Sequence, residues 1–346
     1  MKKIGLIGFF NAGALSDDLI LDATKRHIKR VDPSAEIDEN VMWKCVKEGK
    51  VNVDYLNSFN LLIIGGGSLL GKCTFQPVNS IANWIGKVKT PIAIFGTGYR
   101  YEKQYDPLPE AMRERMRILF DRAYPIMLRG KKSVYQCEKN GISVKNVTCL
   151  GEPIIGAGYK VTVRRQVLGG NVRNMPPDES QYTNNAGVQA QLAKIYDWLI
   201  DATKCDLELL SFREVPGDSD FEGIKKVVQL MKNKARVQMR VALRLDDLLC
   251  QMNHCFWFGA RCHPAVYAAA IGTSFVGYEC QFNKMEDFLS VHDSNLYITP
   301  FKTLNDFKGT YFDAHNPVNR ERLAESIRRN GENIRGFVSS MLEAAN

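Results

Sequence analysis

Short apolar runs alternate with longer amphipathic stretches along the chain, and this alternation constrains the fold more than any other feature. Runs such as Ile4–Phe10, Asn60–Ile64 and Pro91–Phe95 have strand length, whereas Asp17–Lys29 has helical apolar spacing, with Ser16 as its N-cap. Strands that alternate with helices form mostly parallel sheets with helices on both faces. The sequence therefore predicts an α/β fold that binds ligands beyond the carboxyl ends of its strands.

The chain has 346 residues, which suits two domains better than one core. The alternation of strands and helices restarts after a segment that contains Gly158. We expect an N-terminal α/β domain over residues 1–160 and a C-terminal α/β domain over residues 161–316. The segment 317–346 is predicted to form a terminal helix, with a break near Gly331, and its packing back on the N-terminal domain is left open.

Composition narrows the class of protein and its partners. Apolar residues make up 45% of the chain and charged residues 24%, as in soluble globular proteins, and the net charge of +8 favours anionic partners. No nucleic-acid-binding motif is present, so we do not expect nucleic acid among the partners. Nine cysteines without a CxxC pair indicate reduced thiols in a cytoplasm and no metal site. We expect a cytoplasmic protein, and peripheral contact with the inner face of the membrane is left open.

Two glycine turns follow predicted strands, namely Gly65-Gly66-Gly67-Ser68 and Gly96-Thr97-Gly98. Glycines let a ligand approach the backbone closely, and adjacent N–H groups can hold an anion. Neither turn is a P-loop or a GxGxxG motif, so a purely structural turn and a ligand-binding wall both remain open. The candidate binding residues are Gly66, Gly67, Ser68, Gly96, Thr97 and Gly98.

The stretch Ala260–Gly272 places Arg261 and His263 between a buried strand and a helix of small residues. Pro264 suits the first position of that helix, and the helix start can bind a phosphate or carboxylate. Arg261 adds a bidentate cation. A capped histidine of the core remains the alternative for His263. The histidines expected at the surface are His27, His292 and His315.

Three further arginines, Arg129, Arg173 and Arg213, each follow a predicted strand, where ligands of α/β sheets bind. Together they predict a cationic cleft. Asp17 and Asp18 lie in the first turn of a helix, where the helix dipole favours carboxylates. One of the two is also a candidate base that takes a proton from a substrate hydroxyl.

In this order the motifs resemble those of the polysaccharide pyruvyltransferases. The similar segments are "GFFNAGALSDDLIL", the turn Gly65–Leu70, the Gly-Thr-Gly turn, "MLRGKKS", "LGEPI" and "RCHPAVYAAAIG", and they extend from about residue 5 to about residue 289. The sequence departs from the family pattern at Ala14, Ser16, Glu152 and Pro264. Glu152 stands where the family usually carries an aspartate.

The resemblance implies two Rossmann-like domains that face a cleft, similar to the GT-B glycosyltransferases. It implies transfer of a pyruvyl group from phosphoenolpyruvate to a sugar of a cell-surface polysaccharide, or of its lipid-linked precursor, as a cyclic ketal. The N-terminal domain is then the acceptor side and the C-terminal domain the donor side, and no cofactor or metal is required.

Residue roles follow from this chemistry as hypotheses. His263 is the general acid or a phosphate ligand, and Asp17 or Asp18 is the base that activates the acceptor. The donor's anionic groups are expected to bind Arg261, Arg213, Arg173 and Arg129. Two other functions stay open, a GT-B glycosyltransferase that uses a nucleotide sugar and a non-catalytic binder of anionic glycan.

Overall fold

The computed structural model describes residues 1–8, 10–11, 13–46, 52–71, 85–100, 107–161, 163–174, 186–215, 218–278, 284–299 and 302–344. The chain divides into two compact units. The N-terminal unit consists of Met1–Ala12, Ile20–Gly158 and Arg328–Asn346, and the C-terminal unit of Gly13–Leu19 and Tyr159–Ile327. Two helices, α1 (Leu15–Val31) and α13 (Pro317–Glu343), contribute residues to both units.

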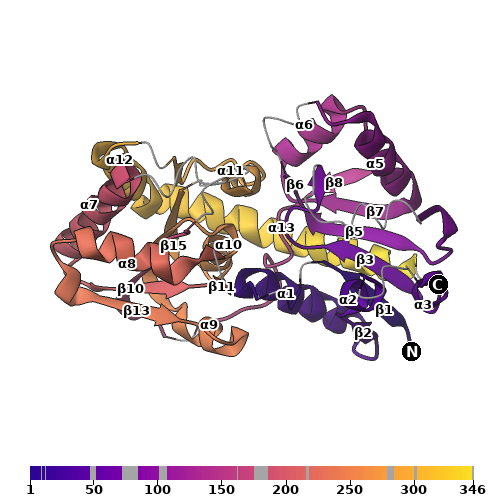
Figure 1. Ribbon diagram of the computed structural model, residues 1–346, viewed down its shortest axis with the longest axis horizontal. Coiled ribbons are helices and arrows are strands. Elements are labelled where there is room, and N and C mark those ends of the chain that lie inside the picture. The colour runs from indigo at the N-terminus through magenta and orange to yellow at the C-terminus, as the bar shows by residue number, and fades with distance from the viewer. Residues whose placement is uncertain are drawn as a thin grey trace. The chain divides into compact units, whose positions relative to one another are not determined.

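The N-terminal unit is built on a parallel six-stranded sheet with the order β2-β1-β3-β5-β7-β8 (Figure 1). Its central strand reads Leu-Leu-Ile-Ile-Gly and is buried along its whole length, as expected for a parallel sheet covered on both faces. The strands are β1 (Lys3–Ile7), β2 (Glu36–Asp38), β3 (Leu61–Gly65), β5 (Ile92–Thr97), β7 (Ala123–Leu128) and β8 (Val147–Cys149). The helices wholly within this unit are α2 (Val41–Val46), α3 (Val53–Asn57), α5 (Glu110–Arg122) and α6 (Lys131–Lys139), with a 3-10 turn at Ile85–Lys87.

The C-terminal unit repeats this plan with the strand order β13-β10-β9-β14-β15-β16, again all parallel. The strands are β9 (Arg165–Asn171), β10 (Asp206–Ser211), β13 (Val237–Val241), β14 (His254–Gly259), β15 (Ser274–Tyr278) and β16 (Tyr297–Ile298). The helices are α7 (Ala186–Thr203), α8 (Asp220–Leu230), α9 (Leu245–Gln251), α10 (Cys262–Ala270), α11 (Lys284–Leu289) and α12 (Leu304–His315), with a 3-10 turn at Lys234–Arg236. Among the described residues there are also two small ribbons, β4 (Leu70–Gly71) with β6 (Tyr99–Arg100) and β11 (Glu214–Val215) with β12 (Asp218–Ser219).

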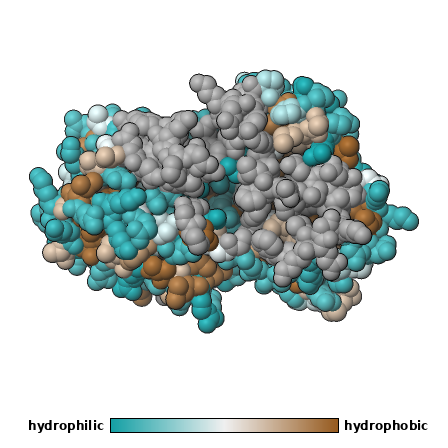
Figure 2. Space-filling model, viewed as in Figure 1, coloured by the Kyte–Doolittle hydropathy of each residue, from teal (hydrophilic) through white to brown (hydrophobic). Residues whose placement is uncertain are grey.

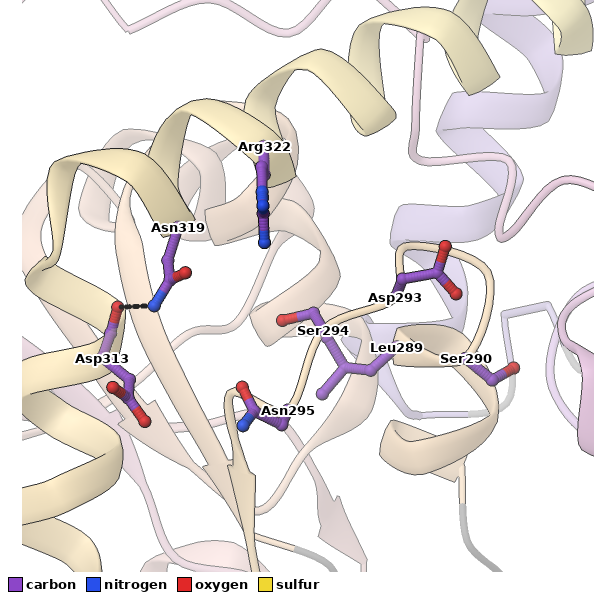
Figure 3. A pocket seen from close by; sticks show the side chains of 8 residues that line it. All are labelled: Leu289, Ser290, Asp293, Ser294, Asn295, Asp313, Asn319 and Arg322. Carbon is purple, nitrogen blue, oxygen red and sulfur yellow. Dashed lines mark hydrogen bonds between the residues drawn. The ribbon is translucent and has the colours of Figure 1, made fainter.

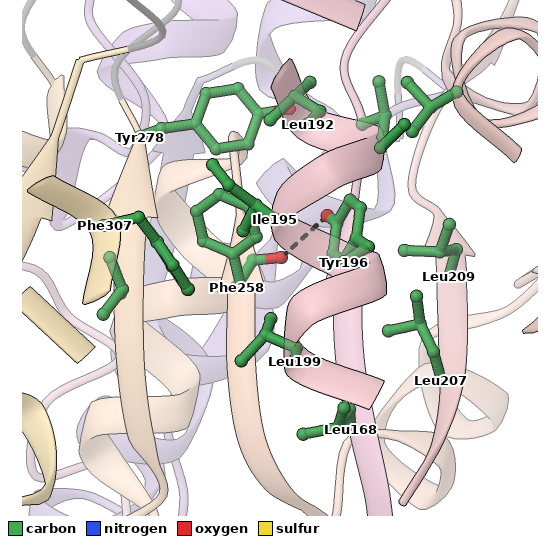
Figure 4. Packing of buried hydrophobic residues seen from close by; sticks show 14 of the residues in the cluster. Leu168, Leu192, Ile195, Tyr196, Leu199, Leu207, Leu209, Phe258, Tyr278 and Phe307 are labelled. Carbon is green, nitrogen blue, oxygen red and sulfur yellow. Dashed lines mark hydrogen bonds between the residues drawn. The ribbon is translucent and has the colours of Figure 1, made fainter. Parts of the chain in front are cut away.

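Helix α7 shows how the core of the C-terminal unit forms. Its apolar positions at helical spacing, including Leu192, Tyr196 and Leu199, face apolar side chains of the sheet such as Phe258 (Figure 4). The Tyr196 hydroxyl is buried there and donates a hydrogen bond of 3.1 Å to the carbonyl oxygen of Phe258. The hydroxyl is therefore satisfied inside an otherwise apolar layer.

The predicted α/β fold with two Rossmann-like halves is confirmed by the two parallel six-stranded sheets. Local boundaries differ in places. Helix α1 begins at Leu15, so Ser16 lies inside its first turn and does not cap it. Strand β13 and helix α12 were not predicted.

Among the described residues, no helix combines the length and the apolar character that crossing a membrane requires.

Two of the three histidines expected at the surface are buried. His27 is 1% exposed, and its Nε2–H donates to the carbonyl oxygens of Pro153 and Ile155 at 2.8 and 3.1 Å. Burial lowers the pKa of His27 to about 4, so the ring is neutral near pH 7. His292 is 5% exposed and lies 3.0 Å from the Ser326 hydroxyl. The expectation was wrong because each ring lies inside the protein and has a hydrogen-bond partner far along the chain.

The predicted break near Gly331 is also wrong, because α13 continues through that residue. A Cβ atom on Gly331 would lie 2.9 Å from the Cα of Gly156, and a Cβ on Gly156 would lie 2.6 Å from the Cα of Gly331. The glycine therefore lets two backbone segments of the N-terminal unit pack directly against each other. From sequence alone, a glycine within a helical pattern indicates a weak point or a break, since glycine weakens an isolated helix.

Two glycines of α13 allow a matched test of this packing. Gly336→Ala has no atom within 4 Å of the new Cβ, so it should stabilise the protein by about 0.5–1 kcal/mol through helix propensity. Gly331→Ala should instead destabilise it by roughly 1–3 kcal/mol through overpacking. Urea unfolding of the two variants and the parent protein measures both changes. Equal stabilisation by the two substitutions would show that the close approach of Gly156 is not required.

Candidate active site

Helix α10 begins at Cys262 with Arg261 as its N-cap, so His263 is the second residue of the helix and Pro264 the third. The prediction that Pro264 occupies the first position is therefore wrong. Proline is tolerated here because the first N–H groups of a helix have no partner within the helix. The N–H groups of Cys262 and His263, and not that of residue 264, belong to the positive end of this helix.

Asn171, at the end of β9, fixes the turn between β14 and α10. Its fully buried side-chain oxygen accepts hydrogen bonds from the backbone N–H groups of Ala260 (2.9 Å) and Arg261 (3.0 Å). A Cβ on Gly259 would lie 2.4 Å from this oxygen, so only glycine allows the amide to approach. Sequence reasoning missed Asn171. The signal was a polar residue that closes the apolar run of β9.

His263 and Asp17 come together in the C-terminal unit. The Nδ1 atom of His263 lies 3.5 Å from Oδ1 of Asp17, and the side chains are 5% and 23% exposed. A carboxylate beside one ring nitrogen orients the imidazole and favours its protonated form, which suits the ring for proton transfer. The histidine is therefore buried, as the core alternative predicts, but it is paired with Asp17, one of the two candidate bases.

The start of α1 is held within the C-terminal unit by backbone contacts. The N–H of Leu15 donates to the carbonyl of Phe212 at 3.1 Å, and Ala14 forms an antiparallel bridge with Arg213. The segment Gly13–Leu19 consequently belongs to the same unit as His263. Their position in the chain predicts instead that both aspartates belong to the N-terminal domain, and this prediction is wrong. A strand-to-helix pattern cannot reveal that the first turn of a helix packs on a distant sheet.

Arg261 does not stand alone at this helix start. Its Nε and Nη2 atoms donate to the two carboxylate oxygens of Asp220, at 3.0 and 2.6 Å, and the side chains are 9% and 0% exposed. Burial raises the pKa of Asp220, while the charges of Arg261 and Arg173 oppose this rise. Asp220 is the first residue of α8 and also accepts from the N–H of Phe212 at 3.2 Å. Sequence reasoning missed Asp220, because its partner lies 41 residues away.

Arg173, Arg213 and Arg261 follow three neighbouring strands, β9, β10 and β14. Because these strands are parallel, their carboxyl ends lie at one edge of the sheet. Arg173 and Arg213 are partly exposed, whereas Arg261 is buried against Asp220. Three of the four arginines predicted to bind anions thus occupy one edge of one unit.

The comparison with protein families decides what this chain is. The profile of the polysaccharide pyruvyl transferase family matches residues 17–281, which includes both Asp17 and His263. The chain belongs to the polysaccharide pyruvyl transferase family. No curated protein sequence matches it.

Solved structures show the fold of this pyruvyl transferase family member. The UDP-GlcNAc 2-epimerase from Neisseria meningitidis bound to UDP-GlcNAc is similar, with a TM-score of 0.58, 12% identity and 99% and 100% of the two chains covered. HepE from Anabaena in complex with UDP-glucose gives a TM-score of 0.60, 10% identity and 99% coverage of each chain. MnaA from S. aureus with UDP gives a TM-score of 0.55 and 15% identity, with 99% of this chain and 98% of that chain covered. These similarities establish a GT-B-like fold of two Rossmann-like halves and nothing about activity.

In the N-terminal unit of this family member, Arg129 is fully buried and forms an ion pair with Glu152, which is also fully buried. Its other nitrogens donate to the carbonyl of Gly67 and, at 3.1 Å, to the hydroxyl of Ser68. Arg129 therefore fixes the glycine turn after β3. Glu152 supplies the compensating charge.

The two glycine turns are joined by hydrogen bonds. The N–H of Gly98 donates to the carbonyl of Gly67 at 3.0 Å, and the N–H of Leu69 donates to the Thr97 hydroxyl at 3.1 Å. These contacts account for the turns structurally, and the interpretation as a ligand-binding wall stays a prediction for Gly66, Gly67, Ser68, Gly96, Thr97 and Gly98. Among the described residues, no group of three or more His, Cys, Asp or Glu side chains could hold a metal ion.

Proposed function

We propose that this protein transfers the pyruvyl group of phosphoenolpyruvate to two hydroxyls of one sugar, forming a cyclic ketal and releasing phosphate. The sugar would belong to a cell-surface polysaccharide or to its lipid-linked precursor. The observation that supports the proposal most directly is the His263–Asp17 pair at the amino end of α10, inside a chain of this family.

The reaction needs proton transfer at two places. One proton adds to the methylene carbon of the enol, which becomes a methyl group, and the neighbouring carbon forms bonds to two sugar oxygens. The bond from that carbon to the phosphate oxygen breaks. The two sugar hydroxyls lose two protons. One replaces the proton that was given to the carbon, and the other leaves on the released phosphate. His263, oriented by Asp17, would give the proton to carbon through Nε2.

The donor carries a phosphate and a carboxylate, so it needs several cationic groups. Arg173 and Arg213 and the positive end of α10 would bind these anions. Arg261 would act from its pair with Asp220, as a fixed positive charge at the helix start. We further propose that the C-terminal unit binds the donor, and that the N-terminal unit binds the acceptor sugar through the two glycine turns.

Phosphate release from phosphoenolpyruvate tests this function. Purified protein is incubated with lipid-linked galactose, glucose or N-acetylmannosamine acceptors, and phosphate and product mass are measured. We expect phosphate release with one acceptor class, together with a product heavier by one pyruvyl group in ketal linkage. Absence of release with every acceptor would contradict the proposal.

A nucleotide-sugar transferase is the second candidate, because the structural neighbours named above were solved with UDP or UDP-sugars. Calorimetric titration with UDP and UDP-glucose separates the two functions. Binding of UDP without phosphate release from phosphoenolpyruvate would favour the nucleotide-sugar enzyme. Activity with neither donor would favour a binder of anionic glycan.

A further inference from the structure

A polar cavity of about 510 Å³ opens on the C-terminal unit. It lies between the turn that follows α11, the end of α12 and the beginning of α13 (Figure 3). Its polar lining includes Asp293, Ser294, Asn295, Asp313, Asn319 and Arg322. The volume falls in the range of small-molecule sites, about 300–1,000 Å³.

The side chains converge from several elements on one space. Figure 3 shows Arg322 pointing from α13 toward Ser294 on the opposite side, and Asn319 of the same helix beside Asp313. Asn319 is fixed by a hydrogen bond of 3.1 Å from its Nδ2 to the carbonyl oxygen of Asp313, at the end of α12. The fixed amide keeps the two helix ends together, so the cavity is a feature of packed helices and not of a single loop.

This lining matches the hydroxyls of a sugar. Arg322 offers several N–H donors, the Asp313 carboxylate only accepts, and the amides of Asn295 and Asn319 and the Ser294 hydroxyl do both. Neighbouring sugar hydroxyls need donors and acceptors side by side, because each hydroxyl donates one hydrogen bond and accepts others. Charged partners make the stronger of these bonds.

The same lining argues against other ligand classes. Leu289 is its single apolar member, which disfavours a lipid chain. One arginine stands against two aspartates, which disfavours phosphates and nucleotides. A calcium ion would require several carboxylate oxygens, and Figure 3 shows Asp293 pointing away from the space that Asp313 and Asn295 border.

The cavity is separate from the His263–Asp17 site. The turn that lines it leads directly into β16 and therefore lies at the amino ends of the parallel strands, whereas α10 starts at their carboxyl ends. We infer that this cavity binds a neutral carbohydrate unit, at an edge of the sheet opposite the site of chemistry. The inference does not require that the protein transfer pyruvate.

A glycan-binding measurement tests the site. The full-length protein is screened on an array of neutral and acidic oligosaccharides built from galactose, glucose and N-acetylhexosamines, and hits are titrated by calorimetry with phosphoenolpyruvate present in excess. We expect a neutral oligosaccharide to bind. Arg322→Ala and Asn295→Ala should each weaken that binding about 10-fold or more, since each removes a bond from a polar or charged group.

Matched variants locate the binding. Arg320→Ala changes an exposed arginine of the same helix that does not line the cavity, and it should leave the affinity unchanged. His263→Ala should also leave it unchanged. Thermal unfolding confirms that each variant is folded, and phosphate release should be the same in Arg322→Ala as in the parent protein. Binding that survives both cavity substitutions, binding lost with His263→Ala, or no neutral oligosaccharide bound at all would each overturn the inference.

Discussion

Replacing His263 by alanine is expected to slow phosphate release from phosphoenolpyruvate by about 10²- to 10⁴-fold, the usual contribution of a positioned general acid or base. The reason is geometric. His263 is nearly buried at the amino end of α10, and its Nδ1 lies 3.5 Å from the Asp17 carboxylate. The measurement is steady-state phosphate release at saturating phosphoenolpyruvate and acceptor, so that a change in kcat is separated from a change in KM.

Asp17→Asn is the companion variant. It keeps the shape of the side chain but removes the negative charge beside the imidazole, so the pKa that His263 contributes to the rate profile should fall. Because His263 acts in its protonated form, the alkaline limb of the pH profile should therefore move to lower pH, while folding stays intact by thermal unfolding. Asp22→Asn serves as the control, because it changes a carboxylate of the same helix whose ion pair is with Arg26. A His263→Ala protein with nearly unchanged kcat would exclude proton transfer by this residue and leave it only a role in anion binding.

The architecture could be predicted from the sequence because the local spacing of apolar residues identifies the strands and helices. Buried strands that end in glycine and helices with one apolar face determine two parallel sheets. The runs Asn60–Ile64 and Pro91–Phe95 form β3 and β5 with small shifts at their ends, and Asp17–Lys29 lies within α1. Where prediction failed, the cause was a contact between distant residues, as between Gly331 and Gly156.

The candidate site likewise contains residues that the sequence could predict and residues that only the structure reveals. Arg261 and His263 could be selected from sequence, because a strand end followed by a helix start is a recognisable position for anion binding. Their carboxylate partners could not be assigned. Asp220 begins a helix 41 residues earlier in the chain, and Asp17 belongs to a helix whose first turn is part of the C-terminal unit. The sequence therefore predicts the positions of the cationic residues, whereas their carboxylate partners are determined by tertiary packing.

The Asp220–Arg261 pair is expected to carry the largest effect on stability. Asp220→Ala leaves the guanidinium of Arg261 buried without its carboxylate, which should destabilise the protein by about 3–5 kcal/mol. Chemical denaturation followed by fluorescence measures this loss. Glu222→Ala is the matched control on the same helix. It removes an exposed ion pair with Lys225, so the free energy of unfolding should hardly change.

The double variant Asp220→Leu with Arg261→Met separates a structural role of this pair from a role in donor binding. Apolar side chains of similar size avoid a buried uncompensated charge, so most of the lost stability should return. If Arg261 also provides positive charge for the donor's anions, the refolded double variant should bind phosphoenolpyruvate at least about 10-fold more weakly, because one charged interaction is missing. If instead both stability and phosphoenolpyruvate affinity recover, the pair only braces α8 against the start of α10, and the donor's charge is balanced by Arg173, Arg213 and the helix end alone.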